Sequence, residues 1–188
     1  MRLDRPRLAP LADAELSPEQ AALIDDFKAR GADYNIFRTF VRDPAALRAF
    51  MVWGGHILSD GNPLGLRRRE LAILRTGFLC KAGYEWAQHE RIGRQAGLTD
   101  AEIAGLKHGP DAPCWDAADR ALLAATDQLV ADHFIADATW TELSRHFAEA
   151  ELLALLLTVG QYTMVAMFLN SAGVQLDPDL TPDPNLRG

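Results

Sequence analysis

Signals that begin and end α-helices follow one another along most of this chain. Ser17-Pro18-Glu19-Gln20 combines an N-cap residue, a proline at the first helical position and a glutamine able to close a capping box. Thr99-Asp100-Ala101-Glu102 repeats the capping box, and Asp43-Pro44 gives another cap followed by proline. No run of about four to eight residues shows the alternation or the β-branched enrichment of a strand. The sequence therefore predicts an all-α fold.

These signals divide the chain into eight expected helices. We place them at about residues 18–30, 44–59, 66–80, 84–95, 100–108, 115–132, 137–147 and 148–171. We expect one domain over residues 1–176, with helical halves at 17–109 and 115–172 joined by a loop. The C-terminal tail, residues 177–188, is rich in Asp and Pro, so we expect an arm or a disordered segment.

The net charge of the chain limits the classes of molecule that it can be expected to bind. Nineteen Lys and Arg against 26 Asp and Glu give a formal net charge of −7, which argues against binding to nucleic acid or to an anionic membrane surface. Two cysteines are too few for a disulfide scaffold, so we expect a cytoplasmic protein. Residues 152–169 are apolar and long enough to be considered as a membrane span, but Thr158, Gln161 and Thr163 interrupt them. We expect a helix buried in the core or at a subunit interface.

Glu85 and His89 stand one helical turn apart in the expected helix 84–95. At about 100° per residue, Glu85, His89 and Ile92 fall on one face, which should be the apolar face of this helix. A carboxylate and an imidazole on a buried face destabilise a fold unless they are paired. Because histidine exchanges protons near neutral pH, such a pair suits general acid–base catalysis, although it can also serve only to hold two helices together.

Glu70 repeats this pattern on the preceding expected helix, 66–80. It shares one side of that helix with Ile73 and Gly77, so it also lies on an otherwise apolar stripe. Two neighbouring helices thus direct acidic groups toward what we expect to be a shared and partly dry space. Glu70, Glu85 and His89 are therefore the candidate catalytic residues.

Several short motifs around these residues resemble one known family. They are Arg69-Glu70-Leu71, then Tyr84-Glu85-Trp86 with His89, and then Ala96-Gly97-Leu98-Thr99 before an acidic helix. Together they look like the carboxymuconolactone decarboxylase family, which includes the alkylhydroperoxidase D proteins. The resemblance covers about residues 66–106, and it implies an alkylhydroperoxidase D-like helical bundle that assembles as an oligomer: a trimer, a hexamer or a dimer.

The resemblance also shows where this chain departs from the alkylhydroperoxidase branch, which carries a Cys-x-x-Cys-x-x-x-His motif. Aligning on His89 puts Glu70 at the upstream glutamate of that branch but places Ala82 and Glu85 at the two cysteine positions. Peroxide reduction through that motif needs a thiolate and a resolving thiol. Cys80 lies nine residues before His89 instead of seven, so a peroxidase or thiol oxidoreductase that uses Cys80 is an alternative only.

The decarboxylase branch implies a lyase or isomerase that works without a cofactor on a small unsaturated lactone or keto acid. In this interpretation His89 is the proton donor and acceptor, Glu85 is its partner, and Glu70 orients the imidazole. Cys80, Tyr84 and Trp86 are expected to line the substrate pocket.

Other readings of these residues stay open. Glu70, Glu85 and His89 can form a two-carboxylate, one-histidine set for a divalent ion, although the chain lacks the repeated motif of di-iron bundles, and we predict no metal. Gln161-Tyr162 interrupts an apolar helix and can meet the pocket from the second half. A protein that binds or assembles without catalysis is the second alternative, in which the polar pair only locks helices together.

Overall fold

The computed structural model describes residues 1–186 and is all-α, as the sequence predicts. Within these residues it contains nine α-helices, two short 3-10 helices and no strand. The 3-10 helices span Asp13–Glu15 and Pro184–Leu186. The α-helices are α1 (Pro18–Ala29), α2 (Asn35–Phe40), α3 (Pro44–Ile57), α4 (Gly65–Leu79), α5 (Gly83–Gln95), α6 (Asp100–His108), α7 (Ala117–Asp132), α8 (Asp137–His146) and α9 (Glu149–Ala172).

Eight of these helices agree with the predicted ranges to within two residues at each end. N-cap side chains mark the start of four of them, α1, α3, α6 and α7. Ser17 accepts a hydrogen bond from the backbone N–H of Gln20, and Asp43 accepts one from Ala46. Thr99 and Glu102 form the predicted capping box at the start of α6. Each cap satisfies backbone donors that the first helical turn leaves free.

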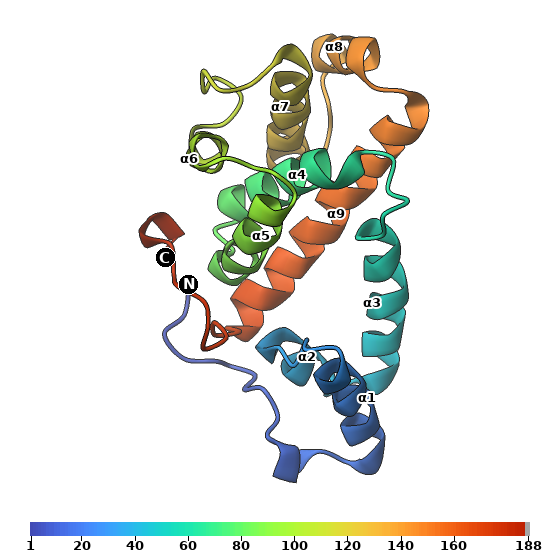
Figure 1. Cartoon of the computed structure of the whole chain (residues 1–188), viewed down its shortest axis with the longest axis vertical. Helices are drawn as coiled ribbons and strands as arrows, with labels where there is room; N and C mark the ends of the chain where they lie inside the picture. The colour runs from blue at the N-terminus through green and yellow to red at the C-terminus, as the bar shows by residue number, and fades with distance from the viewer. Residues whose placement is uncertain (187–188) are drawn as a thin grey trace.

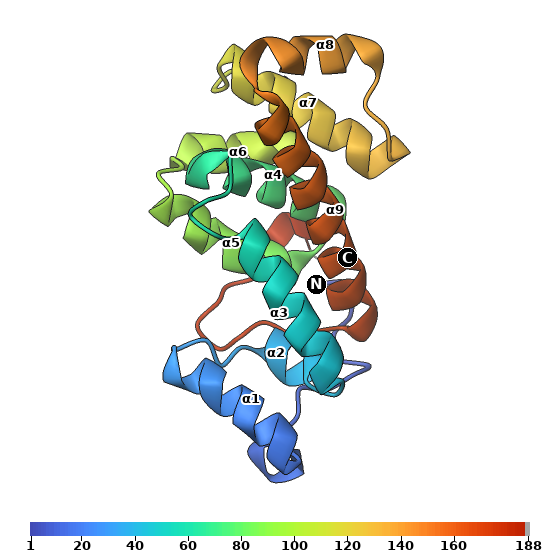
Figure 2. The ribbon, with the colours of Figure 1, turned by 90° about the vertical axis from the view of Figure 1, so that its right-hand side faces the viewer.

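The main hydrophobic core belongs to both halves of the sequence. Helix α4 packs against α5, α7 and α9, and α9 runs diagonally through the molecule behind α4 (Figure 1). Leu71 and Leu74 of α4 meet Leu122 of α7 and Leu155 of α9 in one cluster of buried residues. Figure 2 shows α1 and α2 at one end of the molecule and α7 and α8 at the other. Because α4 is covered on nearly all sides, polar groups on it are held in a dry environment.

Helix α9 is long and apolar enough to cross a membrane when judged by length and composition alone. About half of it (56% of its most apolar window) is buried inside the protein, as expected for the core helix of a soluble protein.

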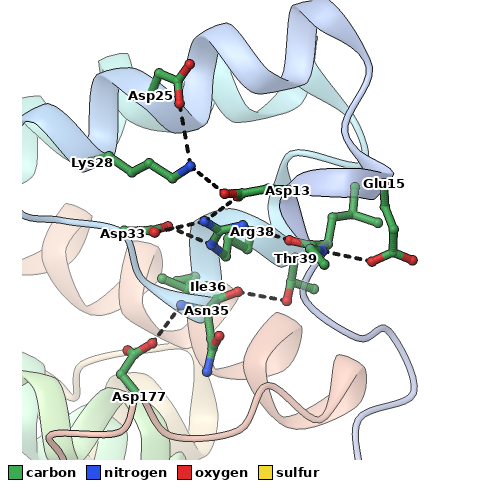
Figure 3. A network of polar contacts seen from close by, with 12 residues as sticks. Asp13, Glu15, Asp25, Lys28, Asp33, Asn35, Ile36, Arg38, Thr39 and Asp177 are labelled. Carbon is green, nitrogen blue, oxygen red and sulfur yellow. Dashed lines mark hydrogen bonds and ion pairs between the residues drawn. The ribbon is translucent and has the colours of Figure 1, made fainter.

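The helix that the sequence did not predict, α2, is fixed by groups from distant parts of the chain. Asp177 in the C-terminal tail accepts a hydrogen bond from the backbone N–H of Asn35 at 2.8 Å, so it caps α2 in place of a local N-cap residue (Figure 3). Arg38 pairs with Asp33 at 2.6 Å and with Asp13 at 2.9 Å. These contacts hold a six-residue helix that would not be stable alone.

The described part of the C-terminal tail, residues 177–186, packs against the helical domain, which differs from the expected arm or disordered segment. Asp177 and Leu186 are almost fully buried, and Asp183 pairs with Lys107 of α6. The amine of Met1 donates to the carbonyl of Leu186, so the first and last described residues lie together (Figures 1 and 2). The reason for the difference is that the Asp residues of the tail have specific partners on the domain.

Gly109, which ends α6, gives a test of this packing. Its φ of 87° and ψ of −155° lie in a region open mainly to glycine, and a Cβ there would stand 2.6 Å from Nη2 of Arg75. We expect Gly109→Ala to lower the free energy of unfolding by about 1–3 kcal/mol from strain, and further through displacement of Arg75 from Asp127. Urea denaturation measures the loss.

The control is Gly31→Ala, where φ is also positive (68°) but no atom lies within 4 Å of the added Cβ. It should show only the backbone strain and therefore a smaller loss. Equal losses in the two variants would contradict a structural role for the close contact with Arg75.

Candidate active site

A mostly apolar cavity of about 220 Å³ lies between α2, α3, α5 and α9. Its apolar wall includes Ile36, Phe37, Phe50, Leu58, Val165 and Leu169. Its polar wall includes Tyr34, Tyr84, Glu85, Gln88, His89, Gln161 and Tyr162. Among the residues that the structure describes, neither a lysine nor an arginine contributes to the wall. The cavity therefore suits a small and largely apolar molecule with few polar groups.

His89 of α5 is held by Glu70 of α4. Nδ1 of His89 lies 2.7 Å from Oε2 of Glu70, and Glu70 is fully buried. The predicted convergence of these two side chains from neighbouring helices is confirmed. The carboxylate fixes the plane of the imidazole ring and stabilises positive charge on it.

The Glu70 carboxylate is kept ionised by two neighbouring side chains, Arg69 and His89. Burial by itself raises the pKa of Glu70, but the charge and hydrogen bonds of His89 and Arg69 outweigh it and leave the pKa below the ordinary glutamate value. Nε of Arg69 lies 3.1 Å from Oε1 of Glu70, and its Nη1 donates to the carbonyl of Leu58 at 2.9 Å. Arg69 thus ties the buried carboxylate to the end of α3.

This arrangement decides which nitrogen of His89 faces the cavity. Because an ionised carboxylate only accepts hydrogen bonds, Nδ1 carries the proton that is donated to Glu70. Nε2 has no hydrogen-bond partner within residues 1–186, and His89 lines the cavity. In the neutral ring Nε2 therefore holds the lone pair, and it is available as a base.

Tyr162 of α9 supports the other side of the imidazole. The two ring centres are 4.8 Å apart and the rings are nearly perpendicular, at 86°. The pKa of Tyr162 is raised well above its ordinary value by burial and by the negative charge of Glu70, so the phenol stays neutral. Residues 161–162 reach the cavity from the second half, which is one of the possibilities that the sequence left open.

Glu85 is also buried, but its carboxyl group does not pair with His89. Both of its oxygens are without a hydrogen-bond partner among the described residues. Its Oε1 lies 2.9 Å from where a Cβ on Gly77 would stand, so the carboxyl group rests against the glycine of α4. Burial raises the pKa of Glu85 well above the ordinary value, which keeps the group neutral. Glu70, and not Glu85, is therefore the hydrogen-bond partner of His89.

Only one of the three residues expected to line the substrate pocket does so. Tyr84 contributes to the cavity wall, whereas Cys80 and Trp86 do not. Trp86 is completely buried in the main core, and its Nε1 donates to Glu90. At about 100° per residue, Trp86 lies about 100° from Glu85 and about 60° from His89 around α5, so its side chain leaves the helix beside the cavity face and enters the main core.

Cys80 is half-buried at the end of α4, outside the cavity wall. Burial and the nearby Glu85 raise the pKa of its thiol to about 11. At neutral pH the thiol is therefore almost entirely protonated, which disfavours the thiolate that peroxide reduction needs.

A second polar cluster, which sequence patterns do not indicate, lies at the edge of the cavity. Oδ2 of Asp177 accepts hydrogen bonds from the hydroxyl of Tyr84 at 2.5 Å and from Nε2 of Gln88 at 2.8 Å. Burial and the Asp177 charge raise the pKa of Tyr84, so this phenol is also neutral. Arg91 donates to Oε1 of Gln88 and to the hydroxyl of Tyr34. Asp177 lies 88 residues beyond His89, so helical spacing cannot reveal it.

No group of three or more His, Cys, Asp and Glu side chains in the described part of the chain is arranged to hold a metal ion. The Glu70–Glu85–His89 set is divided, since Glu85 turns toward Gly77 while Glu70 binds His89.

Comparison with known proteins places this site in a family. Residues 44–128, from the start of α3 into α7, match the carboxymuconolactone decarboxylase family. This segment contains Glu70, Glu85 and His89. This segment of the chain is therefore similar to the carboxymuconolactone decarboxylase family. No curated protein gives a significant match to the sequence.

Solved structures share the fold of almost the whole chain. A peroxidase-related protein from Ralstonia eutropha with an alkylhydroperoxidase AhpD core has a TM-score of 0.77 at 18% identity, over 92% of this chain and 94% of that one. A peroxidase-related protein from Silicibacter sp. has 0.73 at 18%, over 99% and 93%. The debrominase Bmp8, as a variant in complex with 2,3,4-tribromopyrrole, has 0.76 at 13%, over 93% and 94%. The fold is thus alkylhydroperoxidase D-like.

The buried Glu85 makes the stability of this protein depend on pH. Above the ordinary glutamate pKa of 4.5, the unfolded chain has released the proton that folded Glu85 still holds. The folded state then binds more protons, so Glu85 contributes a fall in the free energy of unfolding as pH rises. We expect Glu85→Gln to flatten this fall between about pH 5 and 8, as measured by urea denaturation at a series of pH values.

The control is the same change at the exposed Glu149, which should leave the pH dependence as it is. If Glu85→Gln also left the slope unchanged, the buried carboxyl group would not be protonated in the folded state.

Proposed function

We propose that this protein is a cofactor-independent proton-transfer enzyme, an isomerase or decarboxylase of small unsaturated lactones or keto acids. The observation that carries the proposal is the imidazole of His89, held by an ionised Glu70 and presenting Nε2 to a mostly apolar cavity. A base that is fixed in orientation and sheltered from bulk water suits the removal of a proton from carbon.

The proposed isomerisation needs no other reactant. Nε2 of His89 removes a proton from the carbon next to the substrate carbonyl, and the electron pair of that C–H bond moves into the conjugated system to give a dienolate. The imidazolium then returns the same proton to a more distant carbon. For a keto acid, loss of carbon dioxide supplies the electron pair instead, and the imidazolium protonates the carbon.

The two glutamates have different parts in this scheme. Glu70 is ionised and balances the charge that forms on His89 during the reaction. Glu85 is neutral, so it adds no negative charge beside the developing enolate. The difference follows from their partners, since Glu70 has Arg69 and His89 whereas the Glu85 oxygens have none among the described residues.

Thiol chemistry is less well supported. The similar structures include peroxidase-related proteins and a debrominase. In this chain, however, the raised pKa of Cys80 and its place outside the cavity wall disfavour a thiolate nucleophile. The complex of Bmp8 with 2,3,4-tribromopyrrole supports a small ring, rather than a long chain, as the shape that this fold accommodates.

The main test uses an uncharged five-membered unsaturated lactone in heavy water, with exchange of its ring protons followed by NMR. We expect His89→Ala to slow exchange by about 100- to 10,000-fold, because the base is removed. Glu70→Gln should also slow it, because the charge that balances the imidazolium is lost. Circular dichroism checks that both variants are folded.

Cys80→Ser separates the alternatives in the same assay. The proposal expects an unchanged exchange rate, whereas a thiol mechanism expects its loss together with loss of peroxide consumption. If His89→Ala lowered the melting temperature but left exchange as in the parent protein, the buried pair would serve only to hold the helices together.

We also propose that the enzyme works in the cytoplasm as a homo-oligomer. Both cysteines are free thiols, which suits a reducing compartment. Large apolar side chains are exposed on α3 and α9: Val52 at 79%, Met167 at 61% and Leu153 at 56%. Large apolar side chains that are this exposed favour contact with a second copy.

The oligomer proposal is tested by light scattering coupled to size-exclusion chromatography. We expect a mass that is a multiple of the 20.7 kDa chain. Met167→Glu should shift it toward the monomer by burying a charge in the contact. Arg145→Glu, which also adds negative charge but on the polar helix α8, should not. A monomer at micromolar concentration in the unaltered protein would contradict the proposal.

A further inference from the structure

Gln161 is the one cavity carboxamide that the protein leaves without a partner. Its side chain is only 6% exposed, and it makes no hydrogen bond with any residue in the described range 1–186. The other cavity carboxamide, Gln88, donates to Asp177 and accepts from Arg91. The amide of Gln161 belongs to the cavity wall on the otherwise apolar helix α9, so its hydrogen-bonding groups are available to a ligand in the cavity.

The position of Gln161 places its amide across the cavity. Nε2 lies 3.9 Å from where a Cβ on Gly54 of α3 would stand, so the side chain extends from α9 toward α3 within the cavity wall. The next residue, Tyr162, packs its ring against His89. The free amide and the free Nε2 of His89 therefore belong to one cavity and to adjoining positions of its wall.

Two of the three tyrosine hydroxyl groups in the cavity wall already have hydrogen-bond partners. Those of Tyr34 and Tyr84 are bonded to Arg91 and Asp177. Tyr162 packs its ring against His89 of α5, with the ring centres 4.8 Å apart, whereas the amide of Gln161 extends toward Gly54 of α3. Gln161 is thus the available neutral donor on that side.

We propose that Gln161 is a further catalytic residue, whose Nε2–H donates to the carbonyl oxygen of an uncharged, unsaturated cyclic substrate. The proposal rests on the proton transfer by His89 proposed above. When His89 removes the proton, the electron pair moves toward this oxygen, and the hydrogen bond from Gln161 strengthens as negative charge develops there. The proton returns from His89 to carbon, so no other reactant is consumed.

The side chains of the cavity wall also indicate that the substrate is uncharged. Moving a carboxylate from water into an apolar cavity is unfavourable unless a cation meets it, and no described wall residue is a lysine or arginine. The ionised Glu70 next to His89 adds repulsion. A neutral carbonyl needs only one donor, which Gln161 supplies. The site thus favours isomerisation of a neutral lactone over decarboxylation of a keto acid.

The decisive experiment measures the infrared carbonyl stretch of an uncharged five-membered unsaturated lactone bound to the protein. Donation from Gln161 should shift the stretch to lower frequency, and Gln161→Met should abolish that shift while keeping the reach of the side chain. The control, Gln88→Met, makes the same chemical change at an amide that is already bonded, and it should keep the shift. A shift that survives in Gln161→Met overturns the proposal.

Kinetics and binding supply independent readouts. Gln161→Met should lower kcat for proton exchange by about 100- to 1,000-fold with a much smaller change in KM, as for loss of one donor to a developing oxyanion. The frequency shift should persist in His89→Ala, which lacks the base. Failure of proton transfer would therefore leave the test of Gln161 intact. Tighter binding of the matching lactone carboxylate than of the neutral lactone would overturn the assigned substrate class.

Discussion

The burial of one ionised carboxylate, Glu70, is the constraint on which the site depends. A fully buried negative charge is tolerated only where cations and hydrogen bonds compensate it, and here Arg69 and His89 do so. Arg69 connects Glu70 to the end of α3 through its hydrogen bond to the carbonyl of Leu58, and His89 connects it to α5. The same three residues thus join the helices that border the cavity and set the orientation of its base.

Much of this could be predicted from sequence because the information was local. Caps such as Ser17 and Thr99 act within one helical turn, so they located helix boundaries without knowledge of the tertiary structure. The apolar stripes of α4 and α5 directed Glu70 and His89 inward for the same reason. The fold class and the meeting of these two side chains are therefore confirmed.

What escaped prediction depends on long-range contacts. Helix α2 is capped by Asp177, which is 142 residues away, and Asp177 also binds Tyr84 and Gln88 at the cavity edge. The expected Glu85–His89 pair failed for a related reason, because helical register places two side chains on one face but does not decide which partner on α4 each one meets. Gly77 leaves room for the Glu85 carboxyl group, and so Glu70 takes the imidazole.

Two groups of the cavity wall that have no hydrogen-bond partner among residues 1–186, Nε2 of His89 and the amide of Gln161, have opposite chemical characters. One is a base that acquires positive charge, and the other is a neutral donor toward negative charge. Enolate formation needs both groups, because negative charge moves from carbon to the carbonyl oxygen while the proton moves to the base. Because Glu85 and Tyr162 are neutral, Glu70 is the ionised group that balances the positive charge of the imidazolium. The cavity is therefore better matched to separated charge during a reaction than to a substrate that arrives charged.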